Sequence, residues 1–126
     1  MKTGNNNSIV NVSSTLGLKP TADTSAYSAS KAAMNNWTQS LALALGSKKI
    51  RANCVCPGLV DTPIHSFHSL SIPEKEKTLQ KLSPMQPLGR VGKSEEIAQS
   101  IYFLASEESA WTTGAILSVD GGINIT

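Results

Sequence analysis

The sequence lacks the features that mark membrane-spanning, secreted and nucleic-acid-binding proteins. Its longest apolar runs, such as residues 41–45, are far shorter than the ~20 apolar residues that a helix needs to cross a bilayer. Residues 1–7 are polar and contain no apolar core, so we expect no secretory signal there. A net charge of +2, spread along the chain, gives no basis for binding nucleic acid or an anionic membrane. We therefore expect a cytoplasmic protein whose partners include neither nucleic acid nor a membrane.

Cysteine and histidine are also scarce, which leaves little material for a metal site. Cys54 and Cys56 are two residues apart in an apolar run, so on a strand both would point to the same face. A zinc site would need two further ligands at suitable spacing, and the only histidines, His65 and His68, lie further along the chain. We predict no metal site and interpret both cysteines as small buried thiols.

The length and composition are those of one ordinary globular domain. Three apolar segments have the residue types of buried parallel strands: 8–13, 50–56 and 115–119. Helices are predicted over 26–45 and 73–82, and a third begins with Ser94 as its N-cap. Strands separated by helices pair in parallel through right-handed crossovers. We therefore predict an α/β fold with about three strands and flanking helices, in which one sheet edge is left open.

The helix predicted over 26–45 carries both an apolar stripe and a reactive pair. The stripe repeats at helical spacing, with Met34 widening it: Ala26, Ala29, Ala33, Trp37, Leu41 and Leu45. Near the start of this helix, Tyr27 and Lys31 are four residues apart, so their side chains share a face. A nearby ammonium favours the phenolate form of tyrosine, which suits acid–base catalysis. Such pairs also occur by chance on solvated helices, so the spacing alone does not assign a function.

Polar residues from other segments are expected at the same edge of the sheet. Ser13 and Ser14 end the first predicted strand, and ligands of open α/β sheets bind beyond the carboxyl ends of the strands. The long helix returns from that end and brings the tyrosine–lysine pair with it. Residues 57–58 leave the second strand at the same edge, and residues 61–62 follow within reach. The sequence thus predicts that a hydroxyl, a phenol and an ammonium converge on one crevice.

These segments together resemble the short-chain dehydrogenase/reductase family in their order and spacing. The resemblance extends over residues 8–122 and rests on the segments 9–14 (IVNVSS), 27–31 (YSASK), 57–62 (PGLVDT), 87–90 (PLGR), 95–98 (EEIA), 113–114 (TG) and 119–122 (VDGG). It implies the C-terminal portion of a Rossmann-type, doubly wound parallel sheet. The activity that it implies is NAD(P)-dependent hydride transfer between the carbonyl and alcohol forms of a small molecule.

The resemblance also implies a role for each matching residue. Tyr27 would be the general acid in reduction and the base in oxidation, and Ser14 would hydrogen-bond the carbonyl oxygen. Lys31 would lower the pKa of the tyrosine and hold the nicotinamide ribose, while Ser13 would be a neighbouring structural residue. The cofactor, NAD or NADP, would contact Tyr27, Lys31, Pro57, Gly58, Val60 and Thr62.

The family's nucleotide-binding features are missing from the sequence. None of its glycines forms the Gly-x-Gly-x-x-Gly turn that brings backbone N–H groups to a pyrophosphate, and the closest match joins only Gly89 and Gly92. We therefore expect residues 1–126 to form a single partial domain, the catalytic half of a longer enzyme. Because binding energy from remote parts of a ligand supports turnover, we predict little activity for this chain alone. The residues that distinguish NAD from NADP would lie in the missing half.

Several features leave alternatives open. The chain is either an oxidoreductase by family, a non-catalytic module that pairs with a full-length relative through Trp37 and Leu41, or a fragment that folds poorly. By resemblance, homo-oligomers would form through the helix 26–45 and the last strand. Residues 63–84 would form a substrate lid, on which His65 and His68 either touch substrate or lie on the surface. Trp111 is expected to pack near the last strand.

Overall fold

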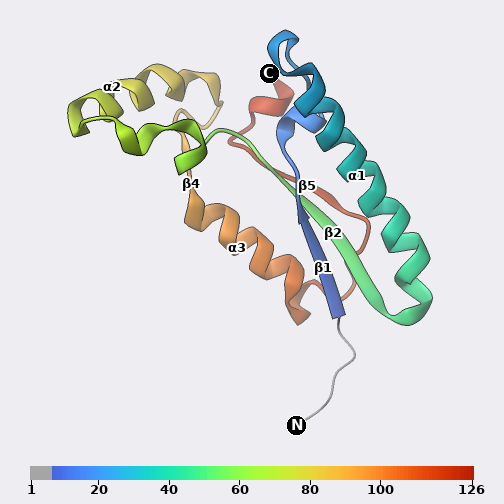
Figure 1. Ribbon diagram of the computed structural model, residues 1–126. Helices are drawn as coiled ribbons and strands as arrows, with labels where there is room; N and C mark the ends of the chain where they lie inside the picture. Colours follow the sequence, from blue (N-terminus) through green and yellow to red (C-terminus); the bar gives the residue numbers. More distant parts are fainter. Residues whose placement is uncertain (1–6) are drawn as a thin grey trace.

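The computed structural model describes residues 7–126 and shows an α/β fold with a parallel sheet (Figure 1). The sheet has the order β1-β2-β5, with β1 at Asn7–Val12, β2 at Ile50–Pro57 and β5 at Ile116–Val119. Helices α1 (Ser25–Leu45) and α3 (Ser94–Ala105) lie on opposite sides of this sheet. The predicted fold class and its three main strands are thus confirmed, while residues 1–6, where we expect no secretory signal, lie outside the described residues.

The central strand β2 forms the core of the molecule. It pairs in parallel with β1 on one side and β5 on the other, with Ile9 opposite Ala52 and Cys54 opposite Ile116. Helices cover both of its faces, so Ala52 and Val55 are fully buried. A strand covered on both faces needs apolar residues in succession rather than in alternation, which is why it reads as a continuous apolar run.

Two long polar side chains of β2 are buried and satisfied by the connection between α3 and β5. Asn53 accepts a hydrogen bond from the Ala115 N–H at 3.0 Å and donates one to the Thr112 carbonyl at 2.9 Å. The Arg51 guanidinium donates to the carbonyls of Leu104 and Ser106, each at 2.9 Å. Because buried donors are costly when unpaired, these contacts tie β2 firmly to the chain that leads into β5.

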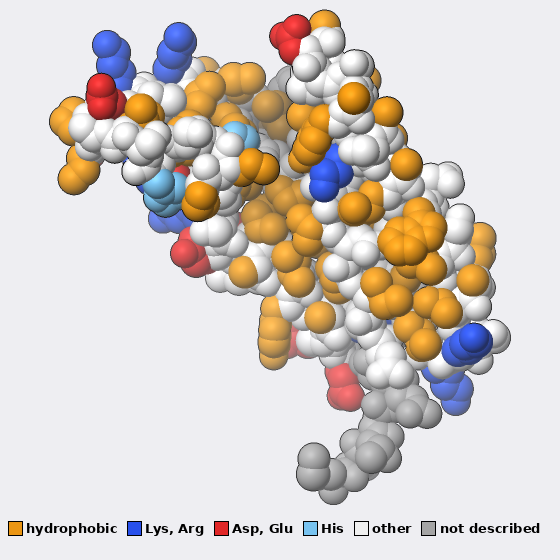
Figure 2. Space-filling view, viewed as in Figure 1, with side chains coloured by type: hydrophobic (Ala, Val, Ile, Leu, Met, Phe, Trp, Pro, Cys, Tyr) orange, Lys and Arg blue, Asp and Glu red, His pale blue; other side chains and the backbone are white. Residues whose placement is uncertain are grey.

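The apolar stripe that identifies α1 is not the face that it buries. Its buried residues are small or polar: Ser28, Asn35, Thr38 and Ala42. The Thr38 hydroxyl is paired, since it accepts a hydrogen bond from the Asn11 amide at 2.9 Å and donates one to the Met34 carbonyl at 2.8 Å. Small side chains let the helix lie close to the sheet, and Trp37 is left 55% exposed on the other side. Figure 2 shows apolar side chains gathered on this exposed side of α1.

The structure also adds and corrects elements. Residues Val60–Asp61 (β3) and Gly92–Lys93 (β4) form a second, two-stranded parallel pair that the sequence did not predict. Helix α2 spans Ile72–Leu82, as expected within one residue. The N-cap of α3 is Lys93 rather than Ser94, because Lys93 has the extended backbone and Ser94 is already helical. No helix among residues 7–126 is long and apolar enough to cross a membrane.

The expectation that Trp111 packs near the last strand is wrong. Its side chain is fully exposed. It follows a short helical turn at Glu107–Ser109, and the next carbonyl, of Thr112, points inward to Asn53 and Arg51. The backbone contacts of the neighbouring residue therefore turn the indole toward solvent.

Candidate active site

A cavity of about 730 Å³ opens at the carboxyl ends of β1 and β2. Its lining includes every residue that the sequence predicted for catalysis or cofactor binding: Ser14, Tyr27, Lys31, Pro57, Gly58, Val60 and Thr62. These residues come from three separate segments of the chain and meet because parallel strands end at the same edge of a sheet. The structure therefore brings the predicted site together, while the role of each residue stays a prediction.

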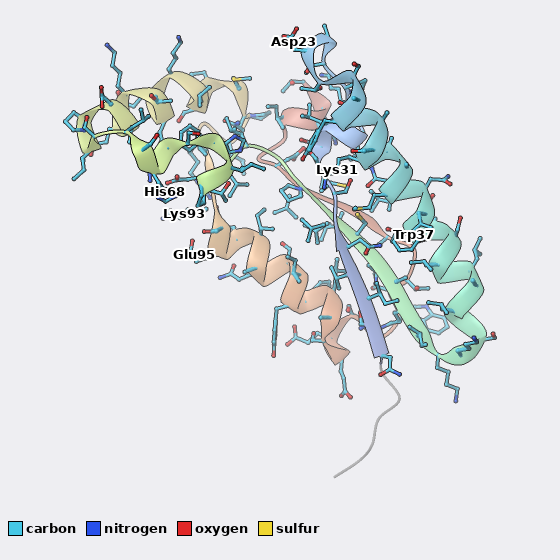
Figure 3. The ribbon with its side chains drawn as sticks, viewed as in Figure 1. Asp23, Lys31, Trp37, His68, Lys93 and Glu95 are labelled. Atoms are coloured by element: carbon cyan, nitrogen blue, oxygen red, sulfur yellow. The ribbon has the colours of Figure 1, made fainter. Side chains whose placement is uncertain are left out.

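Tyr27 and Lys31 lie side by side in the first turns of α1. The Lys31 Nζ is 5.6 Å from the centre of the Tyr27 ring and donates a hydrogen bond to the Val12 carbonyl at 3.2 Å. Figure 3 shows Lys31 pointing from α1 toward the end of β1. This contact anchors the ammonium next to the phenol.

The two neighbouring serines have different hydrogen-bond partners. Ser13 is buried, and its hydroxyl donates to the Lys31 carbonyl at 3.1 Å, so it fastens α1 to the end of β1. Ser14 is half-buried and lines the cavity, and its hydroxyl oxygen accepts from the Leu16 N–H at 3.1 Å. That contact uses the oxygen as an acceptor and leaves the hydroxyl proton available for a ligand. Both serines line the cavity, so the assignment of Ser14 as the reactive serine stays a prediction.

Two glycines allow the site segments to approach each other closely. A Cβ on Gly17 would lie 2.7 Å from the Lys31 carbonyl carbon, and a Cβ on Gly58 would lie 2.6 Å from the Asp120 Cβ. Gly58 also donates its N–H to the Val119 carbonyl at 3.1 Å. Residues 57–58 are consequently held against the turn after β5, and a side chain at Gly58 would push them apart.

The segment that carries Val60 and Thr62 is held by β3 and β4. Val60 pairs with Gly92, and the Gly92 N–H donates to the Leu59 carbonyl at 3.0 Å. Because β4 runs directly into α3, the position of Val60 depends on how the start of that helix is fixed. The small second sheet, which the sequence did not predict, therefore positions part of the predicted cofactor site.

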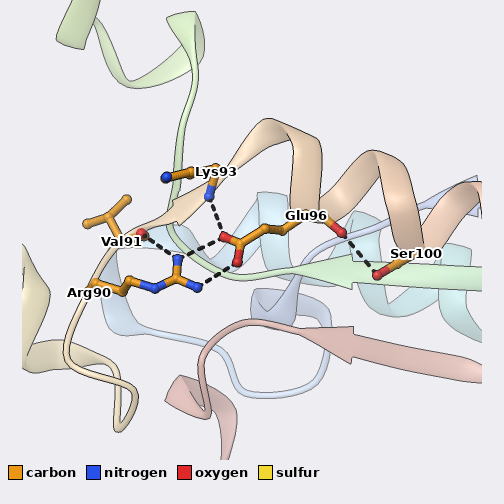
Figure 4. Close-up of polar contacts among 5 residues, drawn as sticks. All are labelled: Arg90, Val91, Lys93, Glu96 and Ser100. Atoms are coloured by element: carbon orange, nitrogen blue, oxygen red, sulfur yellow. Dashed lines mark hydrogen bonds and ion pairs between the residues drawn. The ribbon is translucent and has the colours of Figure 1, made fainter.

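The start of α3 is fixed by Glu96. Its carboxylate accepts two hydrogen bonds from the Arg90 guanidinium, at 2.8 and 2.5 Å, and one from the Lys93 N–H at 2.9 Å (Figure 4). The hydrogen bonds from Arg90, followed by the one from Lys93, lower the pKa of Glu96 from 4.5 to about 2. The ion pair is solvent-exposed, so its main effect is to define geometry rather than to add much stability.

The prediction that both cysteines are buried thiols is confirmed. Cys54 and Cys56 are free and fully buried, and both donate to the Asn35 side-chain oxygen at 3.5 Å. The hydrogen bond with Cys54, together with burial, raises the pKa of the Cys56 thiol. Among residues 7–126, no three His, Cys, Asp or Glu side chains gather in a way that could hold a metal ion.

The cavity has an apolar wall that sequence reasoning missed. Ile97 and Ile101 of α3 line it, together with Val12 at the open edge of β1. The spacing of apolar residues along a helix does not tell which of them enter the core and which face a cavity. Leu104, on the same helix, is buried in the core.

The two histidines of residues 63–84 differ in position. Both are exposed, but His65 lines the cavity and its ring lies 5.3 Å from that of Phe67, which is buried. His68 does not line the cavity. Of the two, His65 is thus the one within reach of a ligand.

Residues 1–124 match the family model described as Enoyl-(Acyl carrier protein) reductase. The chain belongs to the short-chain dehydrogenase/reductase family. Among its curated short-chain dehydrogenase/reductase relatives, the 3-oxoacyl-[acyl-carrier-protein] reductase of Thermotoga maritima is 43% identical over 122 residues, which are 95% of this chain and 46% of the relative. The cis-4-hydroxycyclohexanecarboxylate dehydrogenase of Sinomonas cyclohexanicum is 41% identical over 122 residues, 97% of this chain and 47% of that enzyme.

Solved short-chain dehydrogenase/reductase structures confirm the Rossmann-type fold. The ligand-free aldohexose dehydrogenase of Thermoplasma acidophilum matches with a TM-score of 0.85 and 37% identity, over 94% of this chain and 48% of its own. The NADPH-bound short chain oxidoreductase of Pseudomonas aeruginosa PAO1, which contains an atypical catalytic center, matches with a TM-score of 0.84 and 35% identity, over 92% and 45%. The chain thus spans about half the length of the relatives that it matches.

Proposed function

We propose that this chain carries the catalytic centre of an NAD(P)-dependent oxidoreductase that interconverts a carbonyl and an alcohol. The observation that carries the proposal is that all seven predicted site residues line one cavity at the carboxyl ends of the strands. The names of the relatives, a 3-oxoacyl reductase and a hydroxycyclohexanecarboxylate dehydrogenase, share this pair of functional groups. A small ketone or secondary alcohol is therefore the proposed substrate class.

In this mechanism two side chains act on the substrate oxygen, and a third lies beside one of them. Ser14 donates a hydrogen bond to the carbonyl oxygen and stabilises the negative charge that develops there. Tyr27 gives its proton to that oxygen during reduction and takes it back during oxidation. Lys31, anchored by the Val12 carbonyl, holds its ammonium beside the phenol.

The residues at the cavity fit the nicotinamide end of the cofactor. Polar backbone at Pro57 and Gly58, the Thr62 hydroxyl and the Lys31 ammonium all border the same space. When bound, NAD or NADP supplies the hydride chemistry. Residues 1–126 contain no glycine-rich turn for a pyrophosphate, so we propose that this chain alone turns over slowly.

The proposal is tested by grafting. The 122 matched residues would replace their counterpart in the Thermotoga maritima reductase, and hydride transfer from NADH or NADPH to a 3-oxoacyl thioester would be followed by absorbance. We expect the graft to be active and Tyr27→Phe to lower its kcat by about 10²–10⁴-fold. Tyr102→Phe, at the exposed tyrosine of α3, is the matched control and should leave kcat unchanged.

Two results would contradict the proposal. One is a folded graft without hydride transfer, and the other is a Tyr27→Phe graft with full activity. Robust turnover by residues 1–126 alone, with either cofactor, would separately contradict the proposed weakness of the isolated chain.

A second candidate function is a non-catalytic module that pairs with another copy or with a full-length relative. The exposed face of α1 favours it, since Trp37 is 55% and Leu43 87% exposed. We propose α1 and β5 as the contact surface. Sedimentation of the chain alone and mixed with the Thermotoga maritima reductase tests this, and cofactor titration of the chain separates the two functions. A chain that stays monomeric and does not bind the reductase would exclude pairing.

A further inference from the structure

Residues 63–84, here called the lid segment, are loosely attached to the rest of the molecule. Helix α2 projects away from the sheet in Figure 1 and packs chiefly on the short helical turn Ser83–Met85 that follows it. No residue of α2 is buried, and Phe67 is the one buried residue of the whole lid segment. Burial of side chains therefore contributes little to holding the lid segment against the rest of the molecule.

One ion pair joins α2 to the body. The Lys75 Nζ lies 2.8 Å from the Asp61 Oδ2, and each side chain is 28% exposed. Within residues 7–126, the other side-chain hydrogen bonds of α2 are local and join Ser71 to Glu74, Thr78 to Glu74, and Ser83 to Leu79. The Lys75–Asp61 pair is thus the polar contact that fixes where α2 lies.

Asp61 lies beside residues that line the cavity, so its contact with Lys75 links α2 to the candidate site. Asp61 is the second residue of β3 and stands between Val60 and Thr62, both of which line the cavity. Its partner on β4 is Lys93, at the start of α3, so Asp61 belongs to the firmly held side of the molecule. One carboxylate therefore connects the proposed cofactor loop to the lid segment.

The Asp61 carboxylate has Lys75 as its charged partner. Its second oxygen, Oδ1, is buried and has no hydrogen-bond partner in the described structure. A carboxylate with one such oxygen loses its remaining compensation when the cation on the other oxygen leaves. Undocking of α2 is thus opposed by the cost of leaving Asp61 unpaired, and residues 60–62 are expected to loosen together with it.

We propose that Lys75 and Asp61 form a latch that docks α2 and orders residues 60–62. Lys75 is then a positioning residue for Val60 and Thr62, a consequence that rests on the proposed function. When the latch is closed, α2 is docked on the body and residues 60–62 hold one conformation. When it opens, both are released, so that access to the site and the shape of the site change together.

Hydrogen exchange of the full chain without cofactor tests the latch. For a partly exposed ion pair we expect about two- to fivefold faster exchange of residues 72–82 in Lys75→Met, and faster exchange of residues 60–62 as well. Lys77→Met, on the exposed side of the same helix, is the matched control and should exchange like the wild type. Raising NaCl to ~0.5 M should move the wild type toward Lys75→Met. Equal exchange in wild type and Lys75→Met would overturn the proposal.

Variants that reverse the two charges test whether Lys75 and Asp61 interact directly. Lys75→Arg should keep the wild-type protection, whereas Asp61→Lys and Lys75→Glu should each lose it. The double variant Asp61→Lys/Lys75→Glu should recover most of it, and a double variant as unprotected as the single ones would contradict a direct pair. Protection of residues 50–57 reports whether each variant is folded.

The latch and the proposed function can fail separately. The exchange experiment needs neither cofactor nor turnover, so its outcome is independent of hydride transfer. In the active graft, Lys75→Met should raise KM for substrate or cofactor about two- to fivefold and change kcat less, because the reacting groups stay in place. An unchanged KM with faster lid exchange would remove the positioning role.

Discussion

The body of the molecule and the lid segment are held by different means. In the body, made of β1, β2, β5, α1 and α3, backbone pairing and buried side chains such as Val55 and Leu104 define every position. The lid segment is held by the buried side chain of Phe67 and by the Lys75–Asp61 ion pair. From this difference we expect the lid segment to move more readily than the body, which carries the groups proposed for chemistry.

The largest expected effect is a loss of stability from a substitution in the core of the body. Leu104→Ala removes a fully buried side chain from the core beneath α3, and we expect a loss of about 2–5 kcal/mol in the free energy of unfolding. Urea unfolding followed by circular dichroism measures it. A loss below ~1 kcal/mol would mean that the core is less tightly packed than the structure shows.

The next effect concerns the edge of the body at the cavity. In Gly58→Ala the new Cβ would lie 2.6 Å from the Asp120 Cβ, so the two segments must separate. We expect a loss of about 1–3 kcal/mol in unfolding free energy, measured in the same way. Gly46→Ala is the control, because its Cβ would meet nothing within 4 Å. Equal stability of the two variants would show that the approach of Gly58 to Asp120 is not tight.

A smaller effect is expected from pH at the start of α3. The pKa of Glu96 is lowered from 4.5 to about 2 in the folded chain, so its ionised form stabilises the fold above pH 4.5. That contribution should be lost progressively as the pH falls from 4.5 toward 2. In Glu96→Gln this part of the pH dependence of thermal unfolding should disappear. A Glu96→Gln profile that matches the wild type would contradict the lowered pKa.

The smallest effect sharpens the contrast from the side of the lid segment. Leu79→Ala shortens a half-buried side chain of α2, and we expect it to change the free energy of unfolding by less than ~0.5 kcal/mol. The same urea experiment measures it beside Leu104→Ala. A loss comparable to that of Leu104→Ala would show that α2 is part of the cooperative core.

Local sequence predicted much of the fold because its signals are local. The apolar run 50–56 and the stripe of α1 identify their elements to within one residue at most boundaries. The misplaced N-cap of α3 arose because Ser94 is the better cap by residue type, whereas the backbone turns one residue earlier. Strands β3 and β4 have two residues each, too few for any periodic pattern, and they exist only because they pair.

The candidate site was predicted through a family resemblance, and the structure brings its residues to one cavity. Their chemical roles stay predictions. Neither the resemblance nor periodicity indicated the wall formed by Ile97 and Ile101, or the pairing of Lys75 with Asp61. Residues far apart in sequence leave no spacing signal when they meet through tertiary packing.

By itself, the sequence determined the α/β class, the main elements and the family, because these follow from residue patterns along the chain. The tertiary structure decided which face of α1 is buried, where Trp111 points and how Glu96 positions the second sheet. It also decided which partner Asp61 finds. Each of these features depends on contacts between segments that are far apart in the sequence. Such contacts form only when β2 is packed between β1 and β5 and covered by the helices.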